Sequence, residues 1–232
     1  QINDLLNKYK TNLNLNASVT GLYVNFSTDK PNLKNALDML NDILRNPSFN
    51  EDEFEKVKLE MKAQLESYKS EPQMVASEKL TTITSKYPKN HPYYSATMDE
   101  TLAQLANVKL ADIKDFFQKF YGGTNTYAAF VGEVDKQVAK DFMTSTFDNW
   151  KPQVAYKRIN TQYFDVKSQS ETIQINDKTN AAVLGNLNLK IGESNVDYPA
   201  VDIANELLGG GAFLSSRIPQ RLREAEGMSY GA

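Results

Sequence analysis

Apolar residues with helical spacing are the feature that most restricts how this chain can fold. One stripe consists of Leu33, Leu37, Leu40 and Leu44. These residues recur at i, i+4, i+7 and i+11, which places them on one face of an α-helix, and Pro47 ends the pattern. A second helix begins after Asn50, continues to about residue 70, and carries on one face Phe54, Val57, Met61 and Leu65. We interpret both stripes as faces that pack into a core.

Further helices and several strands follow from the same kind of pattern. We expect helices over residues 72–86, 111–120, 135–147 and 198–208, and a last helix that begins at Ser215 or Ser216 and ends at Gly227. Strict alternation between residues 11 and 28 predicts two antiparallel strands. Shorter apolar runs predict strands at 126–131, 171–175 and 181–189. This mixture predicts an α+β fold, in which antiparallel sheets are each covered on one face by helices.

Length and composition limit the organisation and the chemistry. A chain of 232 residues is long for one compact domain. Because periodicity lapses after residue 149, we expect the rear part of one domain at 1–150, a linker at 151–169 and the front part of the following domain at 170–232. A net charge of −3 offers no broad basic face for nucleic acid. Without cysteine the chain has no disulfide and no thiolate, and no apolar run reaches the roughly 18 residues of a membrane span.

Several segments resemble the pitrilysin/insulinase family of zinc peptidases. Residues 46–49 resemble the family's "NP-x-F" passage, residues 87–93 its "YP…HPY" loop, and residues 130–135 its "vvGDvd" strand end. The most specific segment begins at Leu207 and reads LLGGGAFLSSRIPQRLREAEGMSYGA. It resembles the signature that opens the second domain of a family half. The resemblance implies mitochondrial-processing-peptidase-like metallohydrolase domains, here as an interior piece of a half that does not bind zinc.

The family's zinc site requires an H-x-x-E-H motif on a helix, with two imidazoles one turn apart. This sequence contains a single histidine, His91, which we interpret as a structural loop residue. The resemblance places Gln64 where the family has its third ligand, a glutamate, although in a shifted alignment Glu60 or Glu66 would supply a carboxylate. We therefore expect no metal site in this chain, and zinc bound elsewhere in the parent enzyme.

Catalytic groups of a different kind are implied near the end of the chain. In the family, an arginine and a tyrosine at the spacing of Arg223 and Tyr230 reach the zinc site from the second domain and donate to the scissile carbonyl oxygen. A developing oxyanion needs such preorganised donors. The competing interpretation pairs Arg223 with Glu226 on the surface and packs Tyr230 on the core. Gly209, Gly210 and Gly211 match a peptide-facing loop of the family, whereas Arg217 is interpreted as structural.

The resemblance thus implies a zinc-dependent metalloendopeptidase that hydrolyses peptide bonds, and to which this chain contributes substrate-binding and carbonyl-polarising groups without being active alone. The alternative is a non-catalytic clamshell subunit or scaffold of the same family. The implied partners are a peptide or protein substrate and the zinc-bearing half, in the same protein or in a separate subunit. The resemblance also favours the bacterial periplasm or cell envelope, and the ends of the chain, Gln1 and Ala232, predict an interior piece of a longer protein.

Overall fold

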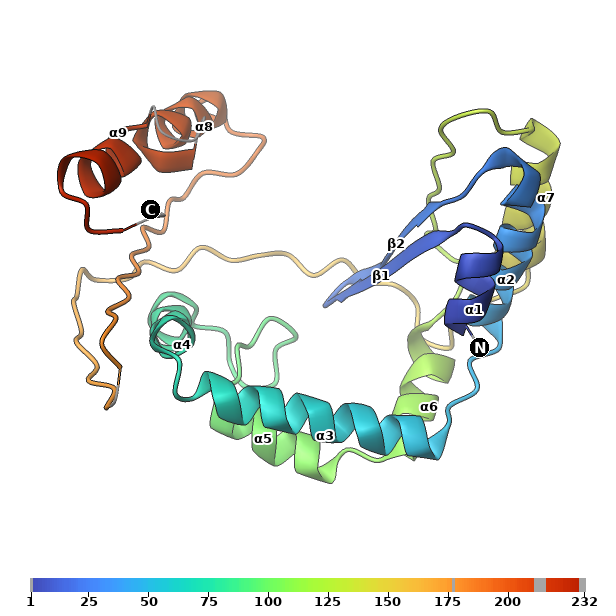
Figure 1. Cartoon of the computed structure of the whole chain (residues 1–232), viewed down its shortest axis with the longest axis horizontal. Helices are drawn as coiled ribbons and strands as arrows, with labels where there is room; N and C mark the ends of the chain where they lie inside the picture. Colours follow the sequence, from blue (N-terminus) through green and yellow to red (C-terminus); the bar gives the residue numbers. More distant parts are fainter. Residues whose placement is uncertain (1, 177, 211–215, 230–232) are drawn as a thin grey trace. The chain divides into compact units, whose positions relative to one another are not determined.

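The computed structural model describes residues 2–176, 178–210 and 216–229, and it begins with a short helix and a hairpin (Figure 1). Helix α1 (Ile2–Lys8) precedes strands β1 (Asn12–Ser18) and β2 (Gly21–Ser27). The two strands pair antiparallel, from Asn12 opposite Ser27 to Ser18 opposite Gly21. The hairpin predicted from the alternation is therefore confirmed. Helix α1, which the sequence patterns did not indicate, buries no side chain.

The best-packed part of the molecule is built around helix α2 (Leu33–Arg45), which follows the 3₁₀ turn η1 (Lys30–Asn32). Helix α2 contacts helix α7 (Lys136–Phe147). The buried apolar side chains among the described residues are Ala36, Leu37, Met39, Leu40, Leu44 and Leu110. Five of these six lie on α2, so the leucine stripe predicted to face the core does so, apart from Leu33 at its start.

Helices α3 (Glu51–Tyr68), α4 (Pro72–Thr84), α5 (Met98–Asn107) and α6 (Leu110–Phe120) lie between α2 and α7 in the sequence. The predicted cap of α3 is present, because the Asn50 side chain accepts a hydrogen bond from the Glu53 amide at 2.9 Å. Helix α5 was not predicted. Its signal is the pair Thr97 and Glu100, which form a capping box at its start.

The second apolar stripe does not face a core, which corrects the prediction. Helix α3 has no buried residue, and both Val57 and Met61 are exposed. The side of α3 towards α5 lies beside Val57 and Met61: Phe54, Lys58 and Leu65 are half-buried, and Lys58 donates hydrogen bonds to carbonyl groups at the end of α5. Amphipathic spacing indicates which residues share a face, but the neighbouring helix decides which face is covered.

The three shorter predicted strands, at 126–131, 171–175 and 181–189, are also wrong for this structure. The described residues of these segments are extended without strand pairing, and Val131 and Val183 are 94% and 96% exposed. A strand is stabilised only when its N–H and C=O groups meet a neighbouring strand. Within the described part of the chain, β1 and β2 pair only with each other, so the other apolar runs have no ladder to join.

The chain forms two compact units, Gln1–Asn186 and Leu187–Ala232. The second contains α8 (Tyr198–Asn205), the π-helical stretch η2 (Glu206–Gly210), the short helix α9 (Arg217–Pro219) and the π-helical stretch η3 (Gln220–Ala225). The fold class is α+β, as predicted, with more helix than strand. The predicted division into 1–150, 151–169 and 170–232 stays a prediction. No helix in the described ranges has the length and apolarity needed to cross a bilayer.

Candidate functional site

The glycine-rich segment predicted to face a peptide follows directly from α8. Gly209 and Gly210 lie in η2, whereas Gly211 lies outside the described residues. The stretch η2 contacts α9, and a β-carbon at Gly209 would come within 3.4 Å of Ile218 Cδ1. Gly209 thus lies directly against the Ile218 side chain of α9. A π-helical turn is wider than an α-helical one and is often found at functional positions.

Arg223 lies in η3, near the end of the last helical segment, as the sequence predicted. The segment ends at Gly227, whose φ of 62° is in the left-handed region that favours glycine. The amides of Gly227 and Met228 donate to the carbonyl oxygens of Arg223 and Leu222, at 3.2 and 2.8 Å. These bonds fix the direction in which the chain leaves the helix. Tyr230 lies outside the described residues, and the catalytic roles of Arg223 and Tyr230 stay predictions.

The carboxylate offered by the sequence as a surface partner of Arg223 is bound by a different arginine. Glu226 forms an ion pair with Arg221. In an α-helix, residues five apart do not share a face. In η3 the Glu226 amide donates to the Arg221 carbonyl at 3.1 Å, which is the i→i+5 bond of a π-helix. The wider turn therefore brings Arg221 and Glu226 together.

The single histidine is held in the loop between α4 and α5. The His91 ring stacks on Tyr87, with 4.4 Å between ring centroids, and its Nδ1 accepts a hydrogen bond from the Tyr93 amide at 3.1 Å. His91 is half-buried and lies against aromatic rings rather than carboxylates. This arrangement fits the structural loop residue that the sequence indicated.

The residues near the expected third zinc ligand do not fit a zinc ion either. The Gln64 amide nitrogen donates to the Tyr68 hydroxyl at 2.6 Å, on the exposed surface of α3. Glu66 pairs loosely with Lys69, at 3.7 Å. Among the described residues there is no group of three or more His, Cys, Asp or Glu side chains that could hold a metal ion. No catalytic step is therefore assigned to zinc within this chain.

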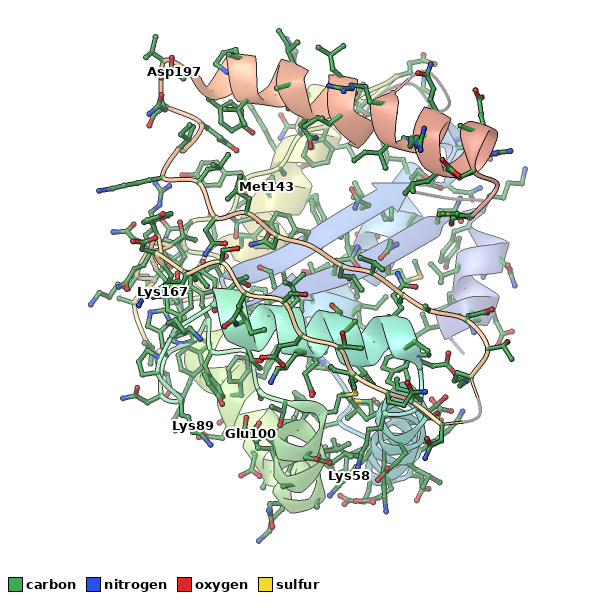
Figure 2. The ribbon with its side chains drawn as sticks, turned by 90° about the vertical axis from the view of Figure 1, so that its left-hand side faces the viewer. Lys58, Lys89, Glu100, Met143, Lys167 and Asp197 are labelled. Carbon is green, nitrogen blue, oxygen red and sulfur yellow. The ribbon has the colours of Figure 1, made fainter. Side chains whose placement is uncertain are left out.

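A polar cluster around Glu100 was not predicted as a unit (Figure 2). Its carboxylate pairs with Lys89, accepts from the Tyr94 hydroxyl at 2.8 Å and accepts from the Thr97 amide at 3.1 Å. The hydrogen bonds from Lys89, Tyr94 and Thr97 lower the pKa of Glu100 to about 2. The same carboxylate raises the pKa of Lys89 and of Tyr94. Three donors on one carboxylate make this a structural clamp on the loop before α5.

An open hollow of about 310 Å³ lies beside this clamp, between α3, α4 and α5. The hydroxyl groups of its threonines are already used by the helices. Thr81 donates to the Ser77 carbonyl at 2.8 Å, and Thr101 donates to the Thr97 carbonyl at 2.9 Å. Another lining residue, Glu78, accepts from the Met98 amide. The hollow therefore offers few uncommitted polar groups to a ligand.

Comparison with protein families defines the class to which this fold and this altered site belong. Residues 107–232 match the family described as "Peptidase M16 inactive domain", and residues 1–97 match the family described as "Insulinase (Peptidase family M16)". The chain belongs to peptidase family M16, as the resemblance predicted.

Individual relatives add detail. The chain is 25% identical, over 227 residues, to a protein of Helicobacter pylori described as "Non-peptidase homolog YmxG", a match that covers 97% of this chain and 50% of that protein. A crystal structure of a peptidase M16 inactive domain from Pseudomonas fluorescens has a similar fold, with a TM-score of 0.73, 22% identity, and coverage of 99% of this chain and 54% of that one. A crystal structure of a protease from Helicobacter pylori gives a TM-score of 0.70, 20% identity, and coverage of 99% and 55%. The chain thus spans about half the length of these relatives.

Proposed function

We propose that this chain is a non-catalytic part of an M16 protein, and that it acts as a scaffold that binds a zinc-bearing half. The observation that carries the proposal is the position and the hydrogen bonding of its single histidine. A zinc site of this family needs two histidines on one helix, whereas His91 lies in a loop and its Nδ1 is already a hydrogen-bond acceptor. The match to an inactive-domain family and the non-peptidase relative support the same proposal.

Gln64 adds to this proposal. An uncharged amide that is bonded to the Tyr68 hydroxyl cannot act as a carboxylate ligand. With a single histidine that lies in a loop and no carboxylate at position 64, the chain would lose the metal chemistry of the family while keeping its helices. Its substrate would be a peptide or protein held against a zinc-bearing half, which belongs either to the same protein or to a separate subunit. The bacterial periplasm or cell envelope remains our proposal for its location.

A second candidate function is a direct contribution to catalysis in a zinc-dependent parent endopeptidase. One observation favours it: the Gly227 turn ends the helix four residues after Arg223. In this case Arg223 and Tyr230 would donate to the scissile carbonyl oxygen. Removing one such donor costs about 10²–10³ in kcat.

Metal analysis tests the first proposal. We expect the purified chain to retain no stoichiometric zinc after mild dialysis and to cleave no fluorogenic peptide with zinc added. One tightly held zinc per chain, or hydrolysis abolished by a chelator and restored by zinc, would overturn the proposal.

Tyr230→Phe separates the two candidates, because it removes a hydroxyl and keeps the ring. It is to be measured in the zinc-loaded parent, or in a complex with a zinc-bearing subunit, alongside melting curves. The second candidate expects a loss of about 10²–10³ in kcat without a loss of melting temperature. An unchanged kcat with an altered KM assigns the residue to ground-state binding and supports the non-catalytic proposal.

A further inference from the structure

The segment after α7 is extended, yet it follows the first compact unit rather than leaving it. Residues 154–176 form no helix or strand, and their path is the yellow-to-orange trace in Figure 1. The first contact lies at the end of α6, where the Val154 amide donates to the Lys119 carbonyl at 3.0 Å. We call residues 154–176 the strap.

The middle of the strap is held by an aromatic cradle, which consists of Tyr87, His91 and Tyr93. The Tyr87 hydroxyl accepts a hydrogen bond from the Gln162 amide at 2.7 Å, and the Tyr93 hydroxyl donates to the Ile159 carbonyl at 3.5 Å. The Phe164 ring meets the Tyr87 ring edge-on, at 4.8 Å between centroids. The Tyr87 ring is itself supported by the His91 stack.

Burial along the strap agrees with docking at these points. Ile159 and Phe164 are half-buried, whereas the four residues between them are exposed. Tyr163, the immediate neighbour of Phe164, is 44% exposed. Successive side chains of an extended chain point to opposite sides. Around Phe164, one side of the strap therefore faces the cradle, and the other side, which carries Tyr163, faces solvent.

Beyond the cradle the contacts change to exposed ion pairs with α4 and its first flanking residue. Glu171 pairs with Lys79 at 3.0 Å, and Lys178 pairs with Glu71 at 2.8 Å. Pairs at this exposure are weak and are screened by salt. The far end of the strap is thus held more loosely than its middle.

We propose that the strap is a tether with two lengths, and that the aromatic cradle sets how far the Leu187–Ala232 unit can move once the weak ion pairs have released. With the ion pairs released and the cradle contacts made, the free chain begins at Phe164 and can span at most about 80 Å. With the cradle also released, the free chain begins at Val154 and can span about 110 Å. The proposal concerns the freedom of the second unit and does not depend on whether the parent is catalytic.

Limited trypsin digestion of the 232-residue chain tests the docking, with cleavage after Lys167 followed by mass spectrometry. Phe164→Ala removes the ring that meets Tyr87 and should raise the cleavage rate by about 2- to 10-fold, because the rate follows the undocked population. The matched control is Tyr163→Ala, which removes an equally large ring from the solvent side and should leave the rate unchanged.

Tyr87→Phe gives an independent test by hydrogen exchange. It keeps the cradle ring and removes only the acceptor of the Gln162 amide, so that amide should exchange several-fold faster while helix α2 remains protected. This variant still tests the docking of the strap if Phe164→Ala lowers the melting temperature of the whole chain. The cradle does not hold the strap if Phe164→Ala and Tyr163→Ala raise the cleavage rate equally. The same conclusion follows if Phe164→Ala leaves the cleavage rate unchanged and Tyr87→Phe leaves the exchange of the Gln162 amide unchanged.

The reach itself can be measured because the sequence contains no cysteine. Lys62→Cys on α3 and Glu193→Cys in the second unit introduce two unique sites for spin or fluorescent labels. We expect Phe164→Ala in 0.5 M NaCl to broaden the distance distribution towards longer values than 0.5 M NaCl alone, because salt weakens only the ion pairs and leaves the cradle as the limit on the reach. A distribution in 0.5 M NaCl that is the same with and without Phe164→Ala would overturn the two-length tether.

Discussion

Helix α2 buries five side chains, whereas α3, α4 and α5 together bury none. Around α2, apolar contact continues into α6, α7 and the residues that follow α7. Phe117 contacts both Phe49 and Trp150, and the Arg45 guanidinium lies 4.9 Å from the Trp150 ring. We refer to α2, α6 and α7 as the buried region, because contacts between apolar surfaces hold it together.

Helices α3, α4 and α5 and the loop at 85–97 form the capped region, which is stabilised mainly by polar contacts at helix ends. Lys58 donates to the carbonyls of Ala106 and Val108, at 3.2 and 2.8 Å, and so caps the C-terminal end of α5 (Figure 2). Lys69 pairs with Asp99 at 2.8 Å in the first turn of the same helix. Glu100 completes the capping box.

The difference shows that one compact unit can contain a region stabilised by apolar burial and another stabilised by charged and polar contacts. The buried region should respond to changes of side-chain volume and be insensitive to pH. The capped region should respond to pH and salt, because its contacts depend on charge. It should also tolerate the loss of apolar side chains that are already exposed.

The largest effect is expected for a cavity in the buried region. Leu40 is 4% exposed, and Leu40→Ala should lower the free energy of unfolding by about 2–5 kcal/mol. Leu59 on α3 is 68% exposed, and Leu59→Ala should change this free energy by less than about 0.5 kcal/mol. Urea unfolding followed by circular dichroism measures both values. Equal losses would remove the distinction between the two regions.

A smaller effect is expected where two backbones approach each other. The Gly123 amide donates to the Trp150 carbonyl at 2.6 Å, and a β-carbon at Gly123 would lie 2.3 Å from the Phe147 carbonyl oxygen. Gly123→Ala should therefore cost about 1–3 kcal/mol of stability. Gly185→Ala, where a β-carbon meets nothing within 4 Å, is the control. A neutral Gly123→Ala would mean that the turn after α6 can shift freely.

The third prediction concerns pH and the capped region. The pKa of Glu100 is lowered from 4.5 to about 2 in the folded chain, so its stabilising effect is complete above about pH 4.5 and is lost as the pH falls towards 2. Glu100→Gln should lower the melting temperature at pH 7, and the difference from the unsubstituted chain should shrink across this window. Asp115→Asn, which breaks an exposed pair with Lys119 on α6, should have little effect at pH 7. A pH-independent difference for Glu100→Gln would contradict the electrostatic account.

The smallest effect is expected at the end of α5. Lys58→Met keeps an unbranched side chain and removes the ammonium, which should cost about 0.3–1 kcal/mol at low salt. The difference should decrease in 0.5 M NaCl. Lys62→Met, on an exposed position of the same helix, should be nearly neutral. If both variants lose the same stability, the cap at α5 contributes nothing specific.

Part of the candidate site could be predicted and part could not. The sequence located Arg223 near the end of a helix and Gly227 at its C-terminal turn, because a glycine beyond an apolar helix is a local signal. It did not indicate the ion pair between Arg221 and Glu226, since the π-helical turn that brings these residues together leaves no pattern in the sequence. The docking of Phe164 on Tyr87 could not be predicted, because these residues are far apart in the chain.

The sequence by itself determined the hairpin at 12–27, helices α2 and α7, and the cap at Asn50, whose side chain accepts from the Glu53 amide at 2.9 Å. These features depend on periodicity and on hydrogen bonds between near neighbours. Only the tertiary structure decided which face of α3 is covered and whether the apolar runs at 126–131, 171–175 and 181–189 form strands. A strand or a covered face requires a partner from a distant part of the chain, and short-range patterns carry no information about that partner.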